Sequence, residues 1–164
     1  MRGRRGASSA DRAGFSFARV DAESSMVRWY MSRHGESVLA EWPGLLARLA
    51  QGPADVALIF QADRAAGLLA WRPDAPGTAE LLADHAIVAR HRDPASRTEF
   101  AYGADGPLRA GGIVHIWAVT DAKPQVKRLR AAGYRRAEKT APLTPGHDGL
   151  VRLERPIIGG RFID

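Results

Sequence analysis

The five histidines are the residues whose type and spacing could most directly support a metal site. His85 and His91 are six residues apart, which matches neither one face of a helix nor a close hairpin pair, and there is no H-E-x-x-H motif. His115 lies in an apolar strand pattern, where a core role is favoured, and His147 lies in the turn-like TPGHDG. The spacing argues against a bound metal. Since the chain has no cysteine, neither a disulfide nor a thiolate zinc site can form.

Loop motifs for covalent catalysis and nucleotide binding are missing too. The sequence contains no G-x-S-x-G elbow, no G-x-G-x-x-G loop and no G-x-x-x-x-G-K-[ST] loop. The pair Gly111-Gly112 precedes an apolar run typical of a strand, so we interpret it as a turn. Hydrolases with that elbow and nucleotide-binding proteins with those loops are therefore disfavoured.

Positive charge is concentrated in two regions of the chain. The net charge is +6, and cations strongly outnumber acids in residues 1–20 and 123–139, which leaves the rest mildly acidic. Nucleic acid could bind through residues 1–12 and 123–139, and its affinity would then fall steeply with salt. The alternative is an ordinary solvated surface. Arginine outnumbers lysine 21 to three, a bias typical of a GC-rich genome as much as of phosphate binding.

Composition predicts three parts of the chain. We expect 1–14, rich in Arg, Gly, Ser and Ala, to be a flexible basic arm, 15–156 to be a single domain with its own core, and 157–164 to be a tail. No apolar run approaches the roughly 18–20 residues that span a bilayer, and the N-terminus lacks the apolar segment of a signal peptide. These features predict no membrane partner and a cytoplasmic location by default.

Short apolar or alternating segments predict the strands of one sheet. Two such segments, 56–62 and 67–73, flank a short polar connection and indicate an antiparallel hairpin. We expect 78–90 to extend it as a third strand, although the periodicity of this segment alone also allows a helix. A strand–helix–strand unit follows later in the chain. The predicted strands are 15–20, 56–62, 67–73, 78–90, 113–119, the segment YRRAEKTA, and 150–156.

Helical periodicity predicts the elements that cover this sheet. Apolar residues recur at steps of three and four over 24–50, and Gly35 and Pro43 interrupt the pattern, so we expect two helices there. A short helix is expected near residues 95–104, within the segment 91–112, whose secondary-structure pattern is the least clear in the chain. The whole order predicts an α/β (α+β) domain with a mixed, mainly antiparallel central sheet flanked by helices.

The helix predicted after the strand 113–119 has clear start and stop signals. Thr120 and Asp121 offer capping oxygens, Pro124 lies in the first turn, and Gly133 supplies a left-handed stop. Together with VKRLRAAGYRRAE and the closing LVRLERPI, this unit resembles the GNAT superfamily of acyl-CoA-dependent N-acyltransferases, in which a helix ending in a leucine, a glycine and an aromatic, commonly LYEKLGF, precedes a terminal hairpin. The element order resembles that family over residues 15–156.

The resemblance implies acetyl-CoA or another acyl-CoA as cofactor, no metal, and an amine as substrate. It places a wedge for the pantetheine arm between the strands that end near Val88 and Val119. Family members hold the pyrophosphate on backbone N–H groups of an Arg/Gln-x-x-Gly-x-Gly/Ala loop at a helix N-terminus, but VARHRDPASRTEFAYGADG has no glycine pair before a helix. Charged and small side chains could substitute. The cofactor-binding candidates are Val88, Arg90, Arg92, Ser96, Arg97 and Lys127.

The resemblance also assigns catalytic candidates. The family's general base on the fourth strand is matched by Glu80 or Asp84, which could serve if burial raised the carboxylate pKa, or could be ordinary surface charges. Leu129 stands where many members have the tyrosine that protonates the thiolate, and Tyr134 fits a packing role.

Three functions are therefore open from the sequence. The first is acyl-CoA-dependent acyl transfer to an amine, with activity that can have been lost. The second is a non-catalytic structural or interaction subunit of a larger assembly such as a virion, with protein subunits as partners and the arginine-rich arm as an anchor. The third is a nucleic-acid-binding accessory protein.

Overall fold

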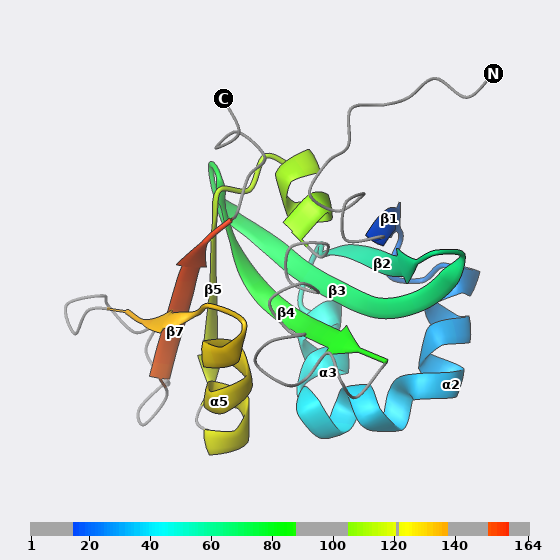
Figure 1. The fold of residues 1–164 in the computed structure, drawn as a ribbon, viewed down its shortest axis with the longest axis horizontal. Helices are drawn as coiled ribbons and strands as arrows, with labels where there is room; N and C mark the ends of the chain where they lie inside the picture. Colours follow the sequence, from blue (N-terminus) through cyan, green and yellow to red (C-terminus); the bar gives the residue numbers. More distant parts are fainter. Residues whose placement is uncertain (1–14, 88–104, 121, 138–150, 158–164) are drawn as a thin grey trace.

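One sheet of seven strands, in the order β1-β2-β3-β4-β5-β7-β6, organises the chain (Figure 1). The computed structural model describes residues 15–87, 105–120, 122–137 and 151–157. A helical segment, 105–110, precedes β5. The elements in chain order are β1 (Phe15–Val20), α2 (Ser25–Glu41), α3 (Leu45–Ala50), β2 (Asp55–Gln61), β3 (Arg64–Ala75), β4 (Thr78–Ala86), β5 (His115–Thr120), α5 (Lys123–Ala131), β6 (Arg135–Arg136) and β7 (Val151–Pro156).

The strands β1 to β4 pair with one another in antiparallel fashion; short turns join β2, β3 and β4, while α2 and α3 lie between β1 and β2. The predicted hairpin is confirmed: β2 pairs with β3, and β4 extends the sheet as the third strand. The middle of each of these three strands is buried, which explains why their sequences are apolar nearly throughout. The sheet is therefore covered on both faces in this half.

The helix α2 begins at a serine cap and runs through the predicted break. The Ser24 hydroxyl accepts a hydrogen bond from the backbone N–H of Val27 at 3.2 Å. The prediction that Gly35 interrupts the helix is wrong: Gly35 is a buried residue inside α2, and a methyl group there would make only ordinary contact with Met31. Pro43 does separate α2 from α3, so the expected pair of helices is confirmed.

The strand–helix unit at the C-terminal end matches the prediction except at its cap. The N-cap of α5 is Ala122, with no side-chain cap, while the Thr120 hydroxyl accepts from the N–H of Ala122 at 3.1 Å. Asp121 lies outside the described residues. Gly133 has φ +95°, the left-handed stop that the sequence predicts. In the described part of the predicted strand YRRAEKTA, only Arg135–Arg136 form a strand.

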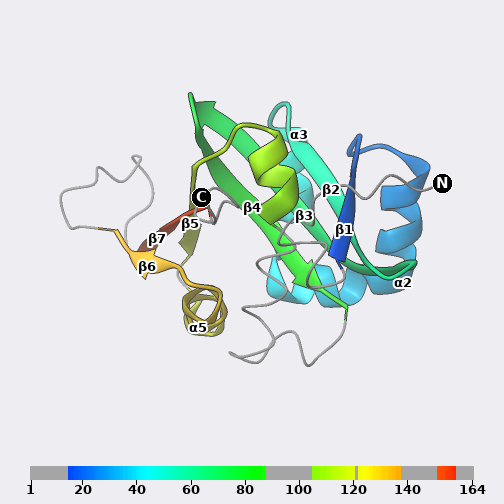
Figure 2. The same ribbon diagram turned by 45° about the horizontal axis from the view of Figure 1, so that its top comes forward.

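The mixed sheet is confirmed, because β4 and β5 run parallel while the other pairings are antiparallel. The helices α2 and α3 cover one face of the sheet, and segment 105–110 lies on the other (Figure 2). That segment packs closely: a methyl group at Gly106 would come within 2.8 Å of the Phe17 ring. The expected short helix near 95–104 lies outside the described residues. Within the described residues, no helix is both long and apolar enough to cross a membrane.

Candidate functional site

The site begins where two parallel strands separate. Thr78 to Glu80 of β4 pair with His115 to Trp117 of β5, and the ladder between these strands ends there. Beyond it, β4 continues along β3, and β5 continues along β7. The divergence predicted between strands ending near residues 88 and 119 is confirmed for their described parts. Facing strand edges that no longer pair offer backbone donors and acceptors to an extended ligand.

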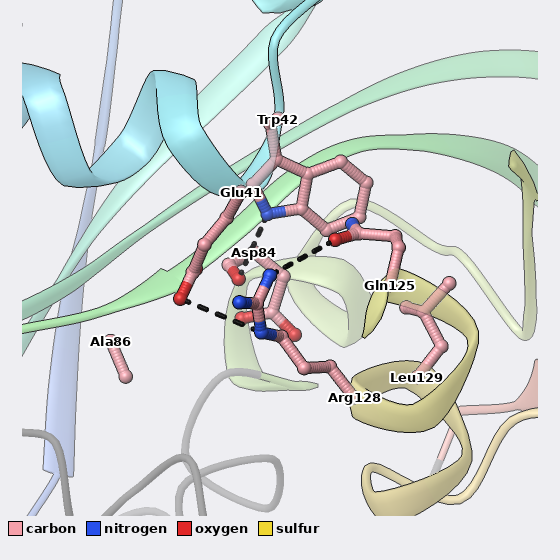
Figure 3. A pocket seen from close by; sticks show the side chains of 7 residues that line it. All are labelled: Glu41, Trp42, Asp84, Ala86, Gln125, Arg128 and Leu129. Atoms are coloured by element: carbon pink, nitrogen blue, oxygen red, sulfur yellow. Dashed lines mark hydrogen bonds and ion pairs between the residues drawn. The ribbon is translucent and has the colours of Figure 1, made fainter. Parts of the chain in front are cut away.

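Side chains from α2, β4 and α5 close this wedge (Figure 3). The enclosed space is about 20 Å³, room for a single water-sized molecule. The Trp42 indole donates to the backbone oxygen of Asp84 at 3.3 Å, and an Arg128 nitrogen donates to the Gln125 side-chain oxygen at 3.4 Å. We call this space the wedge pocket; it is lined by Glu41, Trp42, Asp84, Ala86, Gln125, Arg128 and Leu129.

The sequence places three of these residues together on one side of α5. Positions 125, 128 and 129 fall on one helical face, and two of them, Gln125 and Leu129, are buried. Leu129 stands where many members of the GNAT superfamily have the tyrosine that protonates the thiolate. It therefore lines the wedge pocket with an apolar side chain. In this structure no proton donor stands at that position.

A larger pocket adjoins the wedge pocket on the side of the α2–α3 turn. Its volume is about 180 Å³, and it shares Glu41, Trp42 and Gln125 with the wedge pocket. Its remaining walls come from α3, β4 and the turn between β5 and α5. We call it the adjoining pocket; its further lining residues are Pro43, Gly44, Leu45, Arg48, Leu82, Val119, Thr120 and Ala122.

Glu41 is the carboxylate that both pockets share. Its side chain is 8% exposed, and one of its oxygens lies 3.8 Å from Nε of Arg128. The sequence pattern does not identify this residue, because a glutamate in an amphipathic helix ordinarily faces solvent. The available signal was its position in the last turn of α2, directly before Trp42-Pro43, where the chain turns back across the sheet.

The two acidic residues predicted on β4 do not share a site. Glu80 forms an ion pair with Arg48 of α3 and lines neither pocket. Burial, together with the charge of Arg72, lowers the pKa of Arg48. Arg72 donates to the backbone oxygen of Arg48 at 2.5 Å. Glu80 thus belongs to a set of contacts that fixes α3 on the sheet.

Asp84 lines the wedge pocket and stands near a buried ionic cluster on the opposite face from α2. Two Arg155 nitrogens donate to the two oxygens of Asp105, at 2.5 and 2.9 Å, and the guanidinium carbon lies 5.0 Å from the centre of the Tyr134 ring. Burial would lower the pKa of Arg155, but Tyr134, Asp105 and Asp84 raise it above its ordinary value. Burial raises the pKa of Tyr134, which keeps its hydroxyl neutral. Tyr134 packs as the sequence predicted.

A second polar cluster ties α2 to the diverging half of β4. The Tyr30 hydroxyl lies 2.6 Å from Nδ1 of His85, and the Ser37 hydroxyl lies 2.9 Å from Nε2. Both Tyr30 and His85 are fully buried. A neutral imidazole donates from one nitrogen and accepts at the other, so the two hydroxyls satisfy it. The neighbouring His34 has its pKa lowered by burial and by Arg33. The spacing of the histidines bears only on metal binding, so this role of His85 was not predicted.

The other predicted site residues fall elsewhere. Lys127 lies on the side of α5 opposite the residues of the wedge pocket, where it lines a different groove. His115 is half-buried with Nε2 3.4 Å from a Glu154 oxygen, so the core role favoured for it is wrong.

Among the described residues, no group of three or more His, Asp or Glu could hold a metal ion. The cofactor candidates Val88, Arg90, Arg92, Ser96 and Arg97 lie outside the described residues.

Comparison with solved structures defines the class of fold. The chain has a GNAT-like fold, a mixed, mostly antiparallel seven-stranded sheet with flanking helices. A Klebsiella pneumoniae protein assigned as an acyl-CoA N-acyltransferase is similar with TM-score 0.57 at 18% identity, over 89% of this chain and 99% of that one. Aminoglycoside 6'-acetyltransferase type Ii gives TM-score 0.56 at 14% identity, over 87% of this chain and 97% of that one.

A third structure carries a ligand. It is a GNAT family acetyltransferase from Elizabethkingia anophelis with acetyl-CoA bound, similar with TM-score 0.53 at 12% identity over 87% of this chain and 98% of that one. No family model matches the sequence, and no curated protein matches it either. At these identities the likeness defines the fold, and the activity is a separate question.

Proposed function

We propose that the protein is an acyl-CoA-dependent N-acyltransferase. The observation that carries this proposal is the separation of β4 from β5 after three paired residues, with pockets at the opening. The GNAT fold supports it, as does the structural neighbour with acetyl-CoA bound. A sheet that opens between two parallel strands offers an extended, amide-containing chain two rows of backbone partners.

The arrangement of the backbone fits such a cofactor, but side chains occupy the space that its pantetheine arm would need. The wedge pocket of about 20 Å³ cannot hold a pantetheine arm until Trp42 and Gln125 move aside. Both residues also border the adjoining pocket of about 180 Å³, so space exists next to them. When bound, an acyl-CoA supplies a thioester whose carbonyl carbon is attacked by a neutral amine.

Within this proposal, Glu41 acts as the general base. It is the carboxylate common to both pockets, so an amine in the adjoining pocket could give its proton to Glu41 while facing the wedge pocket. Arg128, with its Nε 3.8 Å from a Glu41 oxygen, would hold the carboxylate in position. Trp42 would exclude water from the reacting atoms. Glu80, held by Arg48, positions α3.

Thermal unfolding with acetyl-CoA tests the proposal. A ligand that binds only the native state at 100 times its Kd stabilises it by about 2.7 kcal/mol, which corresponds to several degrees in Tm for a domain of this size. Glu41→Gln should keep this shift but lower the rate of transfer to an amine by about 10²-fold or more. Glu36→Gln, at an exposed position of the same helix, is the matched control.

The outcomes separate binding from catalysis. No Tm shift at millimolar acetyl-CoA would refute the acyltransferase function. A normal shift with full activity in Glu41→Gln would refute only the assignment of the base.

The filled wedge favours a second candidate, a non-catalytic protein of the same fold acting as an interaction or structural subunit. Trp42, Gln125, Arg128 and Leu129 pack together where the cofactor would lie. If these side chains stay in place, we expect that the protein does not bind acetyl-CoA and that it purifies with other subunits. The Tm experiment therefore distinguishes the two candidates directly.

A further inference from the structure

Eight cationic side chains lie in the described residues of α5, β6 and β7, and four of them make contacts within the fold. Arg128 contacts Glu41, and Arg155 binds Asp105. Arg135 donates to backbone oxygens at the end of α5. Arg152 lies 3.6 Å from a Glu154 oxygen, with its guanidinium carbon 4.4 Å from the centre of the Trp117 ring.

The other four cations line a single groove. Their side chains make no hydrogen bond or ion pair with another residue that the structure describes. The groove lies between α5 and the strands β6 and β7 and holds about 540 Å³. Its apolar side chains are Val126, Val151 and Leu153. We call it the α5–β7 groove; its cations are Lys123, Lys127, Arg130 and Arg136.

This groove is separate from the wedge pocket. Positions 123, 126, 127 and 130 share one side of α5, while 125, 128 and 129 face the opposite way. No acidic residue lines the α5–β7 groove within the described chain, so its local charge is strongly positive. Four cations kept together at an apolar surface repel one another, and an anionic partner would relieve that repulsion.

We propose that the α5–β7 groove binds an acidic amphipathic helix of a partner protein. Aliphatic side chains of that helix would cover the partly exposed Val126 and Val151, and its carboxylates would pair with the surrounding lysines and arginines. The nine residues of α5 span about 13 Å, which matches two to three turns of a helix lying alongside.

The lining chemistry favours this partner over single-stranded nucleic acid. Proteins that bind single strands use aromatic side chains as stacking platforms for the bases. Among the described residues that line the α5–β7 groove, none is aromatic, and the apolar ones are aliphatic. Aliphatic surface between cations suits the apolar stripe of an amphipathic helix instead.

Fluorescence anisotropy with a synthetic peptide tests the proposal. The probe is a labelled 14-residue helix with leucines on one face and glutamates on the other, and a scrambled peptide of the same composition is the comparison. The wild-type protein should bind the helix at least tenfold more tightly than the scrambled peptide. The double variant Arg130→Glu/Arg136→Glu should lose at least tenfold in affinity for the helix. The double variant Arg33→Glu/Arg64→Glu changes the net charge equally at exposed positions elsewhere and should bind like the wild type.

The remaining outcomes overturn the proposal. Equal binding of the helix and the scrambled peptide would show simple charge attraction without a groove. Undiminished helix binding by Arg130→Glu/Arg136→Glu would place the contact elsewhere. If a 20-nucleotide oligo-dT bound more tightly than the helix and lost affinity in that variant, the partner would be a nucleic acid. Circular dichroism of each variant confirms that it remains folded.

Discussion

The two halves of the sheet are built differently. From β1 to β4, long antiparallel ladders join each strand to the next, with up to eight paired residues between β3 and β4. The unit of β5, β7 and β6 attaches to this antiparallel part through three paired residues. The first half is therefore held together by its backbone, while the second depends on side chains for its position. The candidate site lies at that weak seam.

Side chains reinforce the seam in two places. Arg155 of β7, which pairs with Ile116 of β5, binds Asp105, whose segment packs against Phe17 of β1 through Gly106. At the closed end, Asp74 of β3 accepts a hydrogen bond from the Trp117 indole of β5 at 2.7 Å. A seam made this way can open for a ligand without breaking a strand ladder. The stability that is lost when each contact is removed measures how much that contact holds the two halves together.

The largest effect is expected for Arg155→Met. Asp105 is fully buried, and Arg155→Met removes both hydrogen bonds that the guanidinium donates to its carboxylate. Breaking a buried ion pair from one side costs about 3–5 kcal/mol. We expect the free energy of unfolding in urea to fall by that amount. Amide hydrogen exchange should accelerate in β5 and β7 more than in β2 and β3.

The double variant Asp105→Leu/Arg155→Met is the control. It replaces both charges with apolar groups of similar size, a change that is often neutral because the desolvation cost of the pair also disappears. Most of the lost stability should return. If the single variant exchanged uniformly faster in all strands, the two halves would unfold as one unit and the comparison between them would fail.

A smaller effect is expected for Gly133→Ala. Gly133 has φ +95°, a conformation that costs a residue with a side chain about 1–2 kcal/mol. It turns the chain from α5 into Tyr134, which lies under Arg155, so the strain falls on the weaker half. Urea unfolding should show this loss. Gly44→Ala, at φ −88° with room for a methyl group, should be close to neutral; equal losses in both variants would contradict the role of the turn.

The sequence predicted the fold well because local signals agreed with the tertiary structure. Apolar runs and turn residues placed the hairpin and the closing strand, and the glycine after α5 marked its end. The prediction at Gly35 was wrong because a single glycine inside a long amphipathic helix costs only about 1 kcal/mol, and burial compensates for it. The Thr120 cap failed because its hydroxyl bonds to the N–H of Ala122 before the helix begins.

The site was harder to predict, for a physical reason. Its polar residues come from elements far apart in the sequence: Glu41 ends α2, Asp84 lies on β4, and Arg128 lies on α5. Nothing in the local pattern distinguishes such residues from exposed charges. His85 shows the same limitation, because its partners Tyr30 and Ser37 lie about fifty residues away. Only the resemblance to the GNAT family located the wedge, and it did so without identifying these side chains.

The smallest effect is expected for Asp74→Ala at the closed end of the seam. Burial raises the pKa of Asp74, but hydrogen bonds from Thr78, Trp117 and the backbone N–H of Ala75 outweigh it, so the pKa lies below its ordinary value. A lowered pKa in the folded state means that the carboxylate contributes stability above about pH 4, and that this contribution is lost as the pH falls through the folded-state pKa.

Because Asp74 is largely exposed, solvent screening keeps its contribution to about 1 kcal/mol or less. Urea unfolding at pH 7 should show the wild type to be more stable than Asp74→Ala by that amount, and the difference should shrink progressively below pH 4. Asp74→Asn keeps one acceptor oxygen and should fall between the two at pH 7. A difference that stayed constant down to pH 2 would mean that packing at the turn, and not the charged acceptor for Trp117, joins the two halves at this end.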